Sequence, residues 1–495
     1  MSLPSVRGLI RGITLPRKNT MPSQNGYAHD ENTPLMGNGN SPAQNHHSET
    51  YRFFLDLWHT PGMDSDKPFV KFPAQFWHII KATLLRSKIN ILLFCVPIGL
   101  VAGMTGMDPV AVFVINFFAI IPLAAVLSNA TEDISAKLGE HLGGLLNATF
   151  GNAVELIVSV IALKERQYAV VKSSMIGSIL SNLLLVMGMC FFFGGLKNMK
   201  DDAGAGMEQE FTDITAQTTC SLLMLAAASM VVPSALSMVM QSSSNNDPDE
   251  RQQTILNLSR GTAIILLIMY GFYLNFSLRT HHNLFVPKSK QQTQRSPGDE
   301  EQADGQISTE ADCEDEPLLG AWASGAVLVI TTVLVAICAD YLVDSIDALV
   351  ERANISRNFI GLILIPIVGN AAEHVTAVVV AVKNNMDLAM QVAIGSSIQI
   401  AMFVTPFLVV LGWIMGHDMT MRFETFETIA FILAVLVVIY TVQDGKSNYL
   451  EGVMLMAMYV IIAVAFFAAP SDGLSNEDVE GLDAFRASIK ASIPS

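Results

Sequence analysis

Eleven apolar segments constrain this chain more than any other feature of its sequence. A membrane-spanning helix needs about 20 predominantly apolar residues, and each segment is long enough. They cover approximately residues 89–106, 109–130, 143–163, 173–195, 215–240, 260–278, 320–340, 358–382, 387–415, 426–443 and 449–469. Only 15% of the 495 residues are charged, against about 25% in soluble domains, and the mean hydropathy is +0.42. The sequence therefore predicts an all-α polytopic membrane protein and excludes an ordinary cytosolic enzyme.

Polar segments flank the membrane region at both ends. Residues 1–86 are rich in Asn, Ser, Pro and Gly and contain no long apolar run. This composition predicts a largely disordered cytosolic arm rather than a cleaved signal peptide. Arg86 and Lys88 precede the first span, and such a basic flank favours a cytosolic N-terminus. An odd number of spans then places the short tail, 471–495, on the opposite side.

The longest polar break, 279–319, divides the membrane region into 87–278 and 320–470. It begins with basic residues and then carries nine acidic residues between Asp299 and Glu316, with no base among them. A block of like charge concentrates counter-ions around it. This segment is therefore either a solvated cytosolic linker or a cation-attracting, regulatory element.

A sequence repeat relates the two parts of the membrane region. Gly151-Asn152-Ala153-Val154-Glu155 recurs as Gly369-Asn370-Ala371-Ala372-Glu373, an offset of 218 residues (369 minus 151). The same offset carries Ile176-Gly177-Ser178 onto Ile394-Gly395-Ser396. The copies fall in the third and eighth spans, which cross the membrane in opposite directions because five spans separate them. We therefore expect one extra N-terminal helix followed by two inverted five-helix repeats, as in secondary transporters with a site at the repeat interface.

Each copy of the repeat places an amide and a carboxylate on one face of a helix, because the two residues are three positions apart. A carboxylate in the bilayer costs at least ~2.5–3.5 kcal/mol, so a chain that retains two of them uses them or pairs them. Carboxylate, amide, hydroxyl and carbonyl oxygens suit Ca²⁺, and also Mn²⁺ or Mg²⁺. The candidate metal ligands are Asn152, Glu155, Asn370, Glu373, Ser396 and Gln399. A buried structural hydrogen bond is the alternative role for the glutamates.

Other polar residues near the motifs are candidates for supporting roles. Residues that could line the site, or merely allow close helix packing, are Gly151, Ser178, Ser181, Asn182, Gly369 and Ser397. His374 points about 100° away from Glu373 around the helix. It is a candidate for proton coupling with Glu155 and Glu373, or a packed histidine. Acidic residues that could form an ion path to the site, or lie at water-facing helix ends, are Glu132, Asp133, Asp340 and Asp344.

Charge, cysteines and missing motifs exclude several other classes of protein. The formal net charge is −16, so no nucleic-acid partner is expected. The five dispersed cysteines indicate neither a disulfide framework nor a metal site. The sequence contains no HExxH, no GxSxG and no histidine cluster, so we expect no enzymatic activity and no bound cofactor.

Taken together, the repeated motifs resemble those of the cation/proton exchanger family, specifically the vacuolar Ca²⁺/H⁺ exchangers of the calcium/cation antiporter superfamily. The resemblance covers essentially residues 87–470 and rests on 151–156 with 177–182 and on 369–374 with 395–399. It implies eleven spans, alternating access, and Glu155 and Glu373 as carboxylates that bind Ca²⁺ and protons in turn. It also implies that Asn152, Asn370, Ser396 and Gln399 are neutral ligands or hydrogen-bond partners, and that the acidic linker is a cytosolic Ca²⁺-sensing element.

The expected function is a secondary antiporter that moves Ca²⁺ out of the cytosol into an acidic compartment in exchange for H⁺. Residues 314–319 match an acidic dileucine sorting pattern, or simply begin the next span. With the resemblance, they favour the vacuolar membrane. A Mn²⁺/H⁺ or Na⁺/Ca²⁺ exchanger on the same scaffold is an alternative. A cation channel is an alternative of a different class, although channels usually gather charge by subunit symmetry rather than by one carboxylate in each half.

Overall fold

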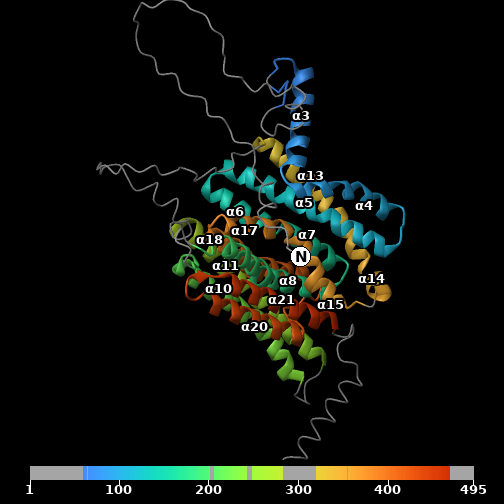
Figure 1. The fold of residues 1–495 in the computed structure, drawn as a ribbon. Helices are drawn as coiled ribbons and strands as arrows, with labels where there is room; N and C mark the ends of the chain where they lie inside the picture. The colour runs from blue at the N-terminus through green and yellow to red at the C-terminus, as the bar shows by residue number, and fades with distance from the viewer. Residues whose placement is uncertain are drawn as a thin grey trace, which may run out of the picture. The chain divides into compact units, whose positions relative to one another are not determined.

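The structure, a computed structural model, describes residues 60–63, 65–200, 206–241, 248–281, 319–353 and 355–468. These residues are almost entirely helical (Figure 1). Among the described residues, eight helices are long and apolar enough to cross a membrane, or up to eleven if each bent pair counts as one span. The predicted all-α polytopic fold is confirmed. The predicted calcium-sensing and sorting roles of the acidic linker fall on residues 299–319. Of these, residues 299–318 lie outside the described part of the chain.

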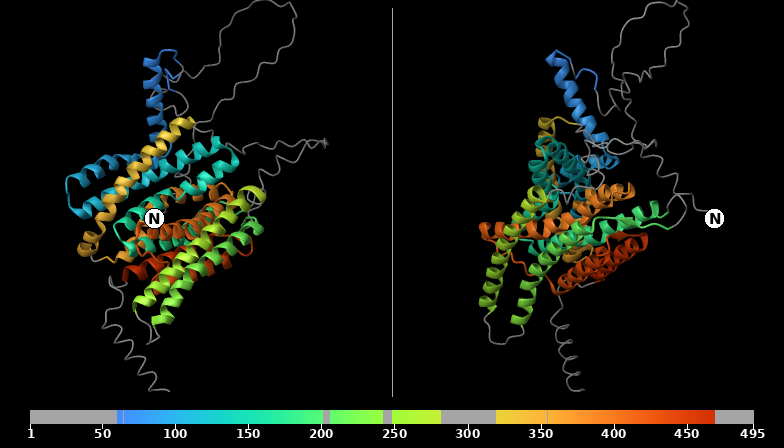
Figure 2. Two further views of the ribbon diagram at one scale, coloured as in Figure 1. Left: turned by 180° about the vertical axis from the view of Figure 1, so that it is seen from behind. Right: turned by 90° about the vertical axis from the view of Figure 1, so that its left-hand side faces the viewer.

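The elements before the linker make up the first half of the membrane region. In chain order they are α3 (Pro68–Leu85), η1 (Lys88–Phe94), α4 (Cys95–Met104), α5 (Pro109–Leu138), α6 (Glu140–Phe150), α7 (Ala153–Lys164), α8 (Tyr168–Leu180), η2 (Ser181–Val186), α9 (Met187–Lys197), β1 (Gln209–Glu210), α10 (Asp213–Gln241), α11 (Pro248–Asn275) and η3 (Phe276–Thr280). Helices α10 and α11 lie side by side in both views of Figure 2.

The elements after the linker make up the second half. They are α13 (Ala321–Asp344), α14 (Ile346–Ala353), α15 (Arg357–Phe359), η5 (Ile360–Leu364), α16 (Ile365–Gly369), α17 (Ala371–Val382), α18 (Met386–Gln399), η6 (Ile400–Val404), α19 (Thr405–Met415), α20 (Thr425–Val442), β2 (Lys446–Ser447) and α21 (Tyr449–Ala468). The two short strands pair antiparallel and are the only sheet in the described residues.

The sequence repeat is also a repeat of the backbone. The bounds of α7 and α9, shifted by 218 residues, coincide with those of α17 and α19. The turns that follow α7 and α17 each contain a residue in the left-handed region, Arg166 with φ 57° and Asn384 with φ 63°. These two residues are again 218 apart. The equivalence therefore extends to helix starts, helix ends and turn conformation over these spans.

Helix α3 differs from what the sequence suggested for this region. Residues 1–86 were expected to be largely disordered, yet their last part forms an 18-residue helix. The chain then bends by 111° between α3 and the η1–α4 segment. Composition did not predict this helix, because its apolar residues alternate with polar ones and do not form one long apolar run. Residues 1–59 lie outside the described part of the chain.

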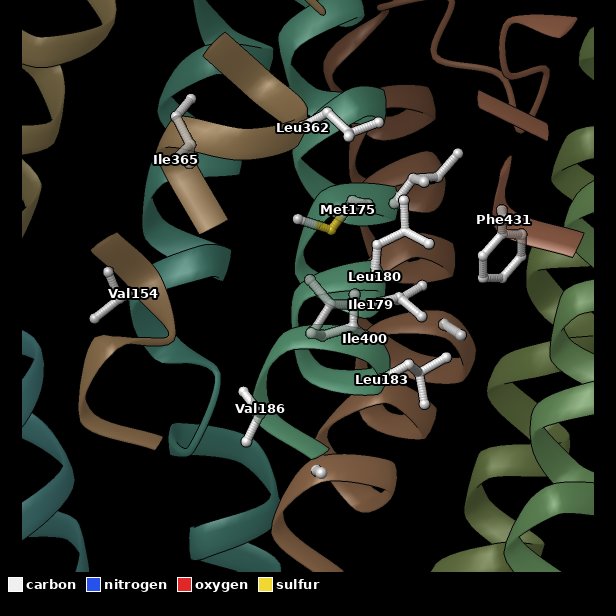
Figure 3. Packing of buried hydrophobic residues seen from close by; sticks show 14 of the residues in the cluster. Val154, Met175, Ile179, Leu180, Leu183, Val186, Leu362, Ile365, Ile400 and Phe431 are labelled. Carbon is white, nitrogen blue, oxygen red and sulfur yellow. The ribbon is translucent and has the colours of Figure 1, made fainter. Parts of the chain in front are cut away.

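Apolar side chains from both halves form one packed interior (Figure 3). Ile179 and Leu183 of the fourth span and Leu362 and Ile400 of the eighth and ninth are fully buried. Interdigitation of this kind fixes the relative positions of the spans, because a close-packed interior tolerates little change in volume. The packing therefore holds the two copies of the repeated motif against each other.

Candidate ion-binding site

Two asparagines interrupt the third and eighth spans at equivalent positions. Asn152 has φ −103° and ψ 28° and separates α6 from α7, which are bent by 47°. Asn370 has φ −82° and ψ 2° and separates the helices before it from α17, with a bend of 57°. Glu155 and Glu373 then lie in the first turns of α7 and α17. Helix N-termini carry partial positive charge, which favours carboxylates there.

A chain of side-chain hydrogen bonds connects three spans at this level. The Asn152 amide donates to Gln399 Oε1 at 2.6 Å, and Ser396 Oγ donates to Asn152 Oδ1 at 2.8 Å. The Asn182 amide donates in turn to Ser396 Oγ at 2.9 Å. Asn152, Asn182 and Ser396 are buried. The predicted residues Asn152, Ser396 and Gln399 are therefore brought together from opposite halves of the chain, with Asn182 beside them.

The two motif carboxylates approach each other across the repeat interface. Glu155 is buried, and a Cβ added at Gly369 would lie 2.6 Å from its Oε1. Gly369 therefore makes room for the Glu155 carboxylate. Glu373 lies beside Ser396 and Asn182, close enough to Glu155 for the two carboxylates to repel each other. A small cavity adjoins Glu155 and Gly369, lined otherwise by apolar residues such as Val154.

Several buried oxygen atoms around these carboxylates have no hydrogen-bond partner in the described part of the chain. They are Ser178 Oγ, Asn182 Oδ1, Asn370 Oδ1 and Glu373 Oε2. Leaving a buried polar atom unpaired costs about 1–3 kcal/mol, and each such atom in a native protein calls for an explanation. All four are oxygens, and oxygen is the ligand atom that Ca²⁺ prefers. The donor set therefore fits a hard divalent cation as the transported substrate.

The hydrogen bonds of the two motif copies are not equivalent. Ser396 donates to Asn152, but the counterpart pair, Ser178 and Asn370, leaves Ser178 Oγ and Asn370 Oδ1 unpaired. The Asn370 amide donates instead to the Ser178 carbonyl, at 3.4 Å. The copies thus share a backbone but hold different arrangements of side chains.

The helix crossings beside the two motif copies are also not equivalent. Gly177 lies directly on the backbone carbonyl of Leu362, where α8 crosses η5. At its counterpart Gly395, no atom lies within 4 Å of an added Cβ. Gly144, the counterpart of Leu362, faces Leu278 of η3 instead. The α8–η5 crossing is therefore closed, and the equivalent positions on α18 and α6 are apart.

Three predicted supporting residues have partners that define their roles. Ser397 donates to the Ala393 carbonyl of its own helix at 2.9 Å, so its hydroxyl is directed away from the carboxylates. Ser181 Oγ and His374 Nε2 are hydrogen-bonded at 3.1 Å. A Cβ added at Gly151 would lie 2.8 Å from the Asn147 carbonyl oxygen and 4.0 Å from Gln399 Oε1. Ser181 and His374 thus form a second polar contact between the halves, next to Glu373.

The acidic residues proposed for an ion path have other surroundings. Asp133 is buried and accepts from Arg86 at 2.8 Å, while the neighbouring Glu132 is half exposed. This ion pair compensates the charge that an ion path would use. Asp340 and Asp344 interact electrostatically with Lys164 at the end of α7. They therefore lie near the end of α7, and their role in an ion path stays a prediction.

One further buried carboxylate lies outside the repeated motifs. Glu427, in the first turn of α20, is buried and accepts from the Glu424 amide at 3.3 Å in a capping box. Lys172 of α8 interacts with it electrostatically and donates to Thr420 at 3.0 Å. The cost of a carboxylate in an apolar segment was the signal that could have found it. Among the described residues, no group of three or more His, Cys, Asp or Glu side chains could hold a metal ion.

The fold and this site are those of a membrane cation exchanger, and comparison with known proteins agrees. The sequence signature of the sodium/calcium exchanger protein family matches residues 109–279 and 323–468. The chain therefore belongs to that family, and the predicted resemblance is confirmed.

Individual relatives narrow the comparison. A vacuolar calcium ion transporter of Schizosaccharomyces pombe is 45% identical over 393 residues, covering 79% of this chain and 87% of the relative. A Ca²⁺/H⁺ antiporter of Synechocystis is 41% identical over 389 residues, covering 78% of this chain and 99% of the relative. The solved structure of native YfkE is similar with a TM-score of 0.61 and 35% identity, covering 77% of this chain and 100% of that one.

Proposed function

We propose that this protein is a secondary antiporter that moves Ca²⁺ out of the cytosol into an acidic compartment in exchange for protons. One observation carries the proposal: the Glu155 carboxylate lies against Gly369 of the second motif copy, about one helical turn before Glu373, among buried neutral oxygens. The relatives named as a vacuolar calcium ion transporter and a Ca²⁺/H⁺ antiporter support the same cargo. They also favour the vacuolar membrane as the location.

Competition at one site couples the two ions. With both carboxylates ionised, Glu155 and Glu373 attract a divalent cation, and the amide and hydroxyl oxygens complete its ligands. When each carboxylate takes a proton, that attraction disappears and Ca²⁺ leaves. The neutral, protonated site can then return across the low-dielectric interior, where an unpaired charge would be costly.

The driving force is sufficient. A compartment about two pH units more acidic than the cytosol supplies on the order of 5 kcal/mol for two protons, at 1.36 kcal/mol per unit each. A thousandfold Ca²⁺ gradient costs roughly 4.1 kcal/mol. Two protons balance the charge of one Ca²⁺, so this exchange can maintain such a gradient without any contribution from the membrane potential.

Inverted repeats provide the alternating access that the exchange requires. With a cytosolic N-terminus, the third span begins at α6 on the cytosolic side and the eighth begins at η5 on the opposite side. The open positions on α18 and α6 then face the cytosol, and the closed α8–η5 crossing faces the compartment. Partial exposure of Glu373, against burial of Glu155, fits a site reached from the cytosol.

The test is ⁴⁵Ca²⁺ uptake into sealed liposomes that contain the purified chain and an acidic interior. Uptake should require the proton gradient, so a protonophore should abolish it, and Glu155→Gln and Glu373→Gln should each reduce it to background. Glu427→Gln is the matched control, because it removes a buried carboxylate outside the site while retaining an oxygen that can cap α20. We expect it to transport.

The alternatives predict other outcomes. Uptake indifferent to the pH gradient would contradict proton coupling and favour a channel. Uptake driven by a sodium gradient would identify a Na⁺/Ca²⁺ exchanger. If Mn²⁺ rather than Ca²⁺ moves with the proton gradient, the cargo assignment is wrong while the site assignment stands.

A further inference from the structure

Helix α3 has two unlike faces, and the chain covers the one that carries His78 and Lys81 beside Ala74 and Ala82. His78 and Lys81 are buried, and His78 is hydrogen-bonded to Thr60 at 3.1 Å. Gly62, in the segment before α3, lies against Val70 and Ala74 of that helix. The segment before α3 therefore packs on the face that carries these polar groups, which is the reverse of what an aqueous setting favours.

The opposite face is an exposed aromatic stripe, formed by Phe69, Phe72 and Phe76. They are 96%, 69% and 67% exposed. Spacings of three and four residues place them on one side of the helix, and Leu84, 43% exposed, extends the same side two turns on. A stripe of this kind left open by the protein indicates an apolar environment around it.

This helix is not needed to cross the membrane. The following segment, Lys88–Met104, contains seven residues of 3₁₀-helix and ten of α-helix. At about 2.0 and 1.5 Å per residue these reach about 29 Å, close to the ~30 Å hydrocarbon thickness. The bend of 111° at residues 86–87 then turns α3 close to perpendicular to that span. A helix perpendicular to a span runs along the membrane surface.

From Lys67 to the end of the first span, the charged residues of the chain are all basic. No Asp or Glu occurs between Asp66 and Asp108, while that stretch contains Lys67, Lys71, Lys81, Arg86 and Lys88. Lys67 and Lys71 are exposed at the start of the helix. Basic residues near a bilayer surface are each attracted to anionic lipid by about 1 kcal/mol. The flanking charge therefore complements an anionic headgroup layer.

We propose that α3 is an interfacial helix, lying in the headgroup region of an anionic leaflet with Phe69, Phe72 and Phe76 inserted toward the acyl chains. Lys67 and Lys71, exposed at its start, contact the lipid phosphates and carboxylates. At its C-terminal end, the Arg86–Asp133 ion pair attaches it to α5. The lipid-anchored helix thereby fixes the depth at which the first span enters the bilayer.

The test measures depth directly. A nitroxide is attached to a single cysteine at Phe69, Phe72, Phe76 or Leu84 of the full chain, with the native cysteines replaced by alanine. Accessibility to oxygen and to a water-soluble nickel chelate gives its depth in phosphatidylcholine vesicles with and without phosphatidylserine. We expect one shallow depth at all four sites, and greater depth at a control label on Ile98, which is exposed on α4.

Three outcomes would contradict the proposal. A depth that changes steadily from Phe69 to Leu84, by about 22 Å over 15 residues, would mean that α3 crosses the bilayer. Chelate accessibility typical of water at every site would mean that the stripe faces water and does not enter the bilayer. Labels that do not respond to phosphatidylserine, or respond equally after Lys67→Gln and Lys71→Gln, would contradict the role of anionic lipid.

Hydrogen exchange on the unmodified chain provides a second measurement that needs no cysteine replacement. The α3 amides should exchange more slowly in vesicles with phosphatidylserine than in phosphatidylcholine alone, while those of α20 should not change. Equal exchange of α3 in both would contradict the proposal. Neither measurement uses transport, so their failure would leave the proposed exchange activity untouched.

Discussion

At position 369 the missing side chain is what gives the Glu155 carboxylate its place. An added Cβ would lie 2.6 Å from Glu155 Oε1, far inside van der Waals contact. The glycine also precedes the break at Asn370, so the same residue loosens the eighth span and admits a carboxylate from the third. One small residue thus couples the two copies of the motif.

We expect Gly369→Ala to displace the Glu155 carboxylate and to reduce Ca²⁺ uptake at least tenfold, because the methyl group occupies its position. Gly261→Ala is the control, since nothing lies within 4 Å of a Cβ there on α11. That variant should transport normally and melt slightly higher, because alanine is favoured over glycine in helices by up to ~1 kcal/mol. Normal ⁴⁵Ca²⁺ uptake by Gly369→Ala would contradict the assigned contact.

Neighbouring serines on α18 offer a second matched pair. Ser396 bonds both Asn152 and Asn182, so Ser396→Ala removes two hydrogen bonds of about 1 kcal/mol each. This should raise the KM for Ca²⁺ by up to roughly 30-fold, at 1.4 kcal/mol per decade. Ser397→Ala loses only a bond within its own helix and should leave KM near its wild-type value. Equal KM values for the two variants would show that the hydrogen-bond chain does not position the ligands.

The site could be predicted from sequence only in part. Spacing identified Asn152 and Glu155 because intramembrane polar groups are costly, and the offset located their counterparts. Spacing also placed Ser396, three residues before Gln399, among the ligands and Ser397 only among the lining residues. It could not give the hydrogen-bond partner of either serine, since partners depend on tertiary packing. Nor could it reveal that Asp133 is paired with Arg86, because that contact joins segments 47 residues apart.

At the scale of single elements, α5 shows that a helix can extend beyond its apolar segment. The apolar pattern predicted 109–130, whereas the helix continues to Leu138. Its polar extension is stabilised by contacts: Thr131 donates to the Leu127 carbonyl, and Asp133 binds Arg86. Hydropathy locates the part of a helix in lipid, but hydrogen bonds and ion pairs decide where the helix ends.

The Arg86–Asp133 ion pair should be a strong contact between elements. Because Asp133 is buried, Arg86→Gln leaves an uncompensated carboxylate, which should lower the free energy of unfolding by about 3–5 kcal/mol. The control is Arg352→Gln, whose partner Asp108 is exposed; that loss should stay under about 1 kcal/mol. Thermal unfolding of the full chain in detergent compares them. Similar melting temperatures for both variants would mean that Asp133 finds other compensation.

At the scale of the whole molecule, two copies of one backbone hold different contacts. Sequence predicted the repeat and its offset because identical short motifs recur at one spacing. It could not predict which crossing would be closed, because Gly177 and Gly395 lie in the same motif and differ only in what packs on them. That difference comes from the arrangement of whole spans, not from local propensity.

Alternating access predicts that Gly395 becomes the closed crossing when the halves exchange roles. Gly395→Ala has room in the present arrangement, so the melting temperature should be unchanged or higher. In the opposite arrangement its methyl group would meet the Gly144 carbonyl, at an overpacking cost of about 1–3 kcal/mol. Transport should slow by roughly 5- to 150-fold at 1.4 kcal/mol per decade. Full uptake rates from a variant that melts normally would contradict an exchange of roles.

The unequal halves have a consequence for what a single structure contains. If each residue is replaced by its counterpart 218 positions away, the present arrangement becomes a description of the state that faces the opposite compartment. There Ser178 would donate to Asn370, and Asn152 would release Ser396. Under the proposed alternating access, the symmetry of the sequence is therefore complete only over a full transport cycle, because each half adopts the conformation that the other half has just left.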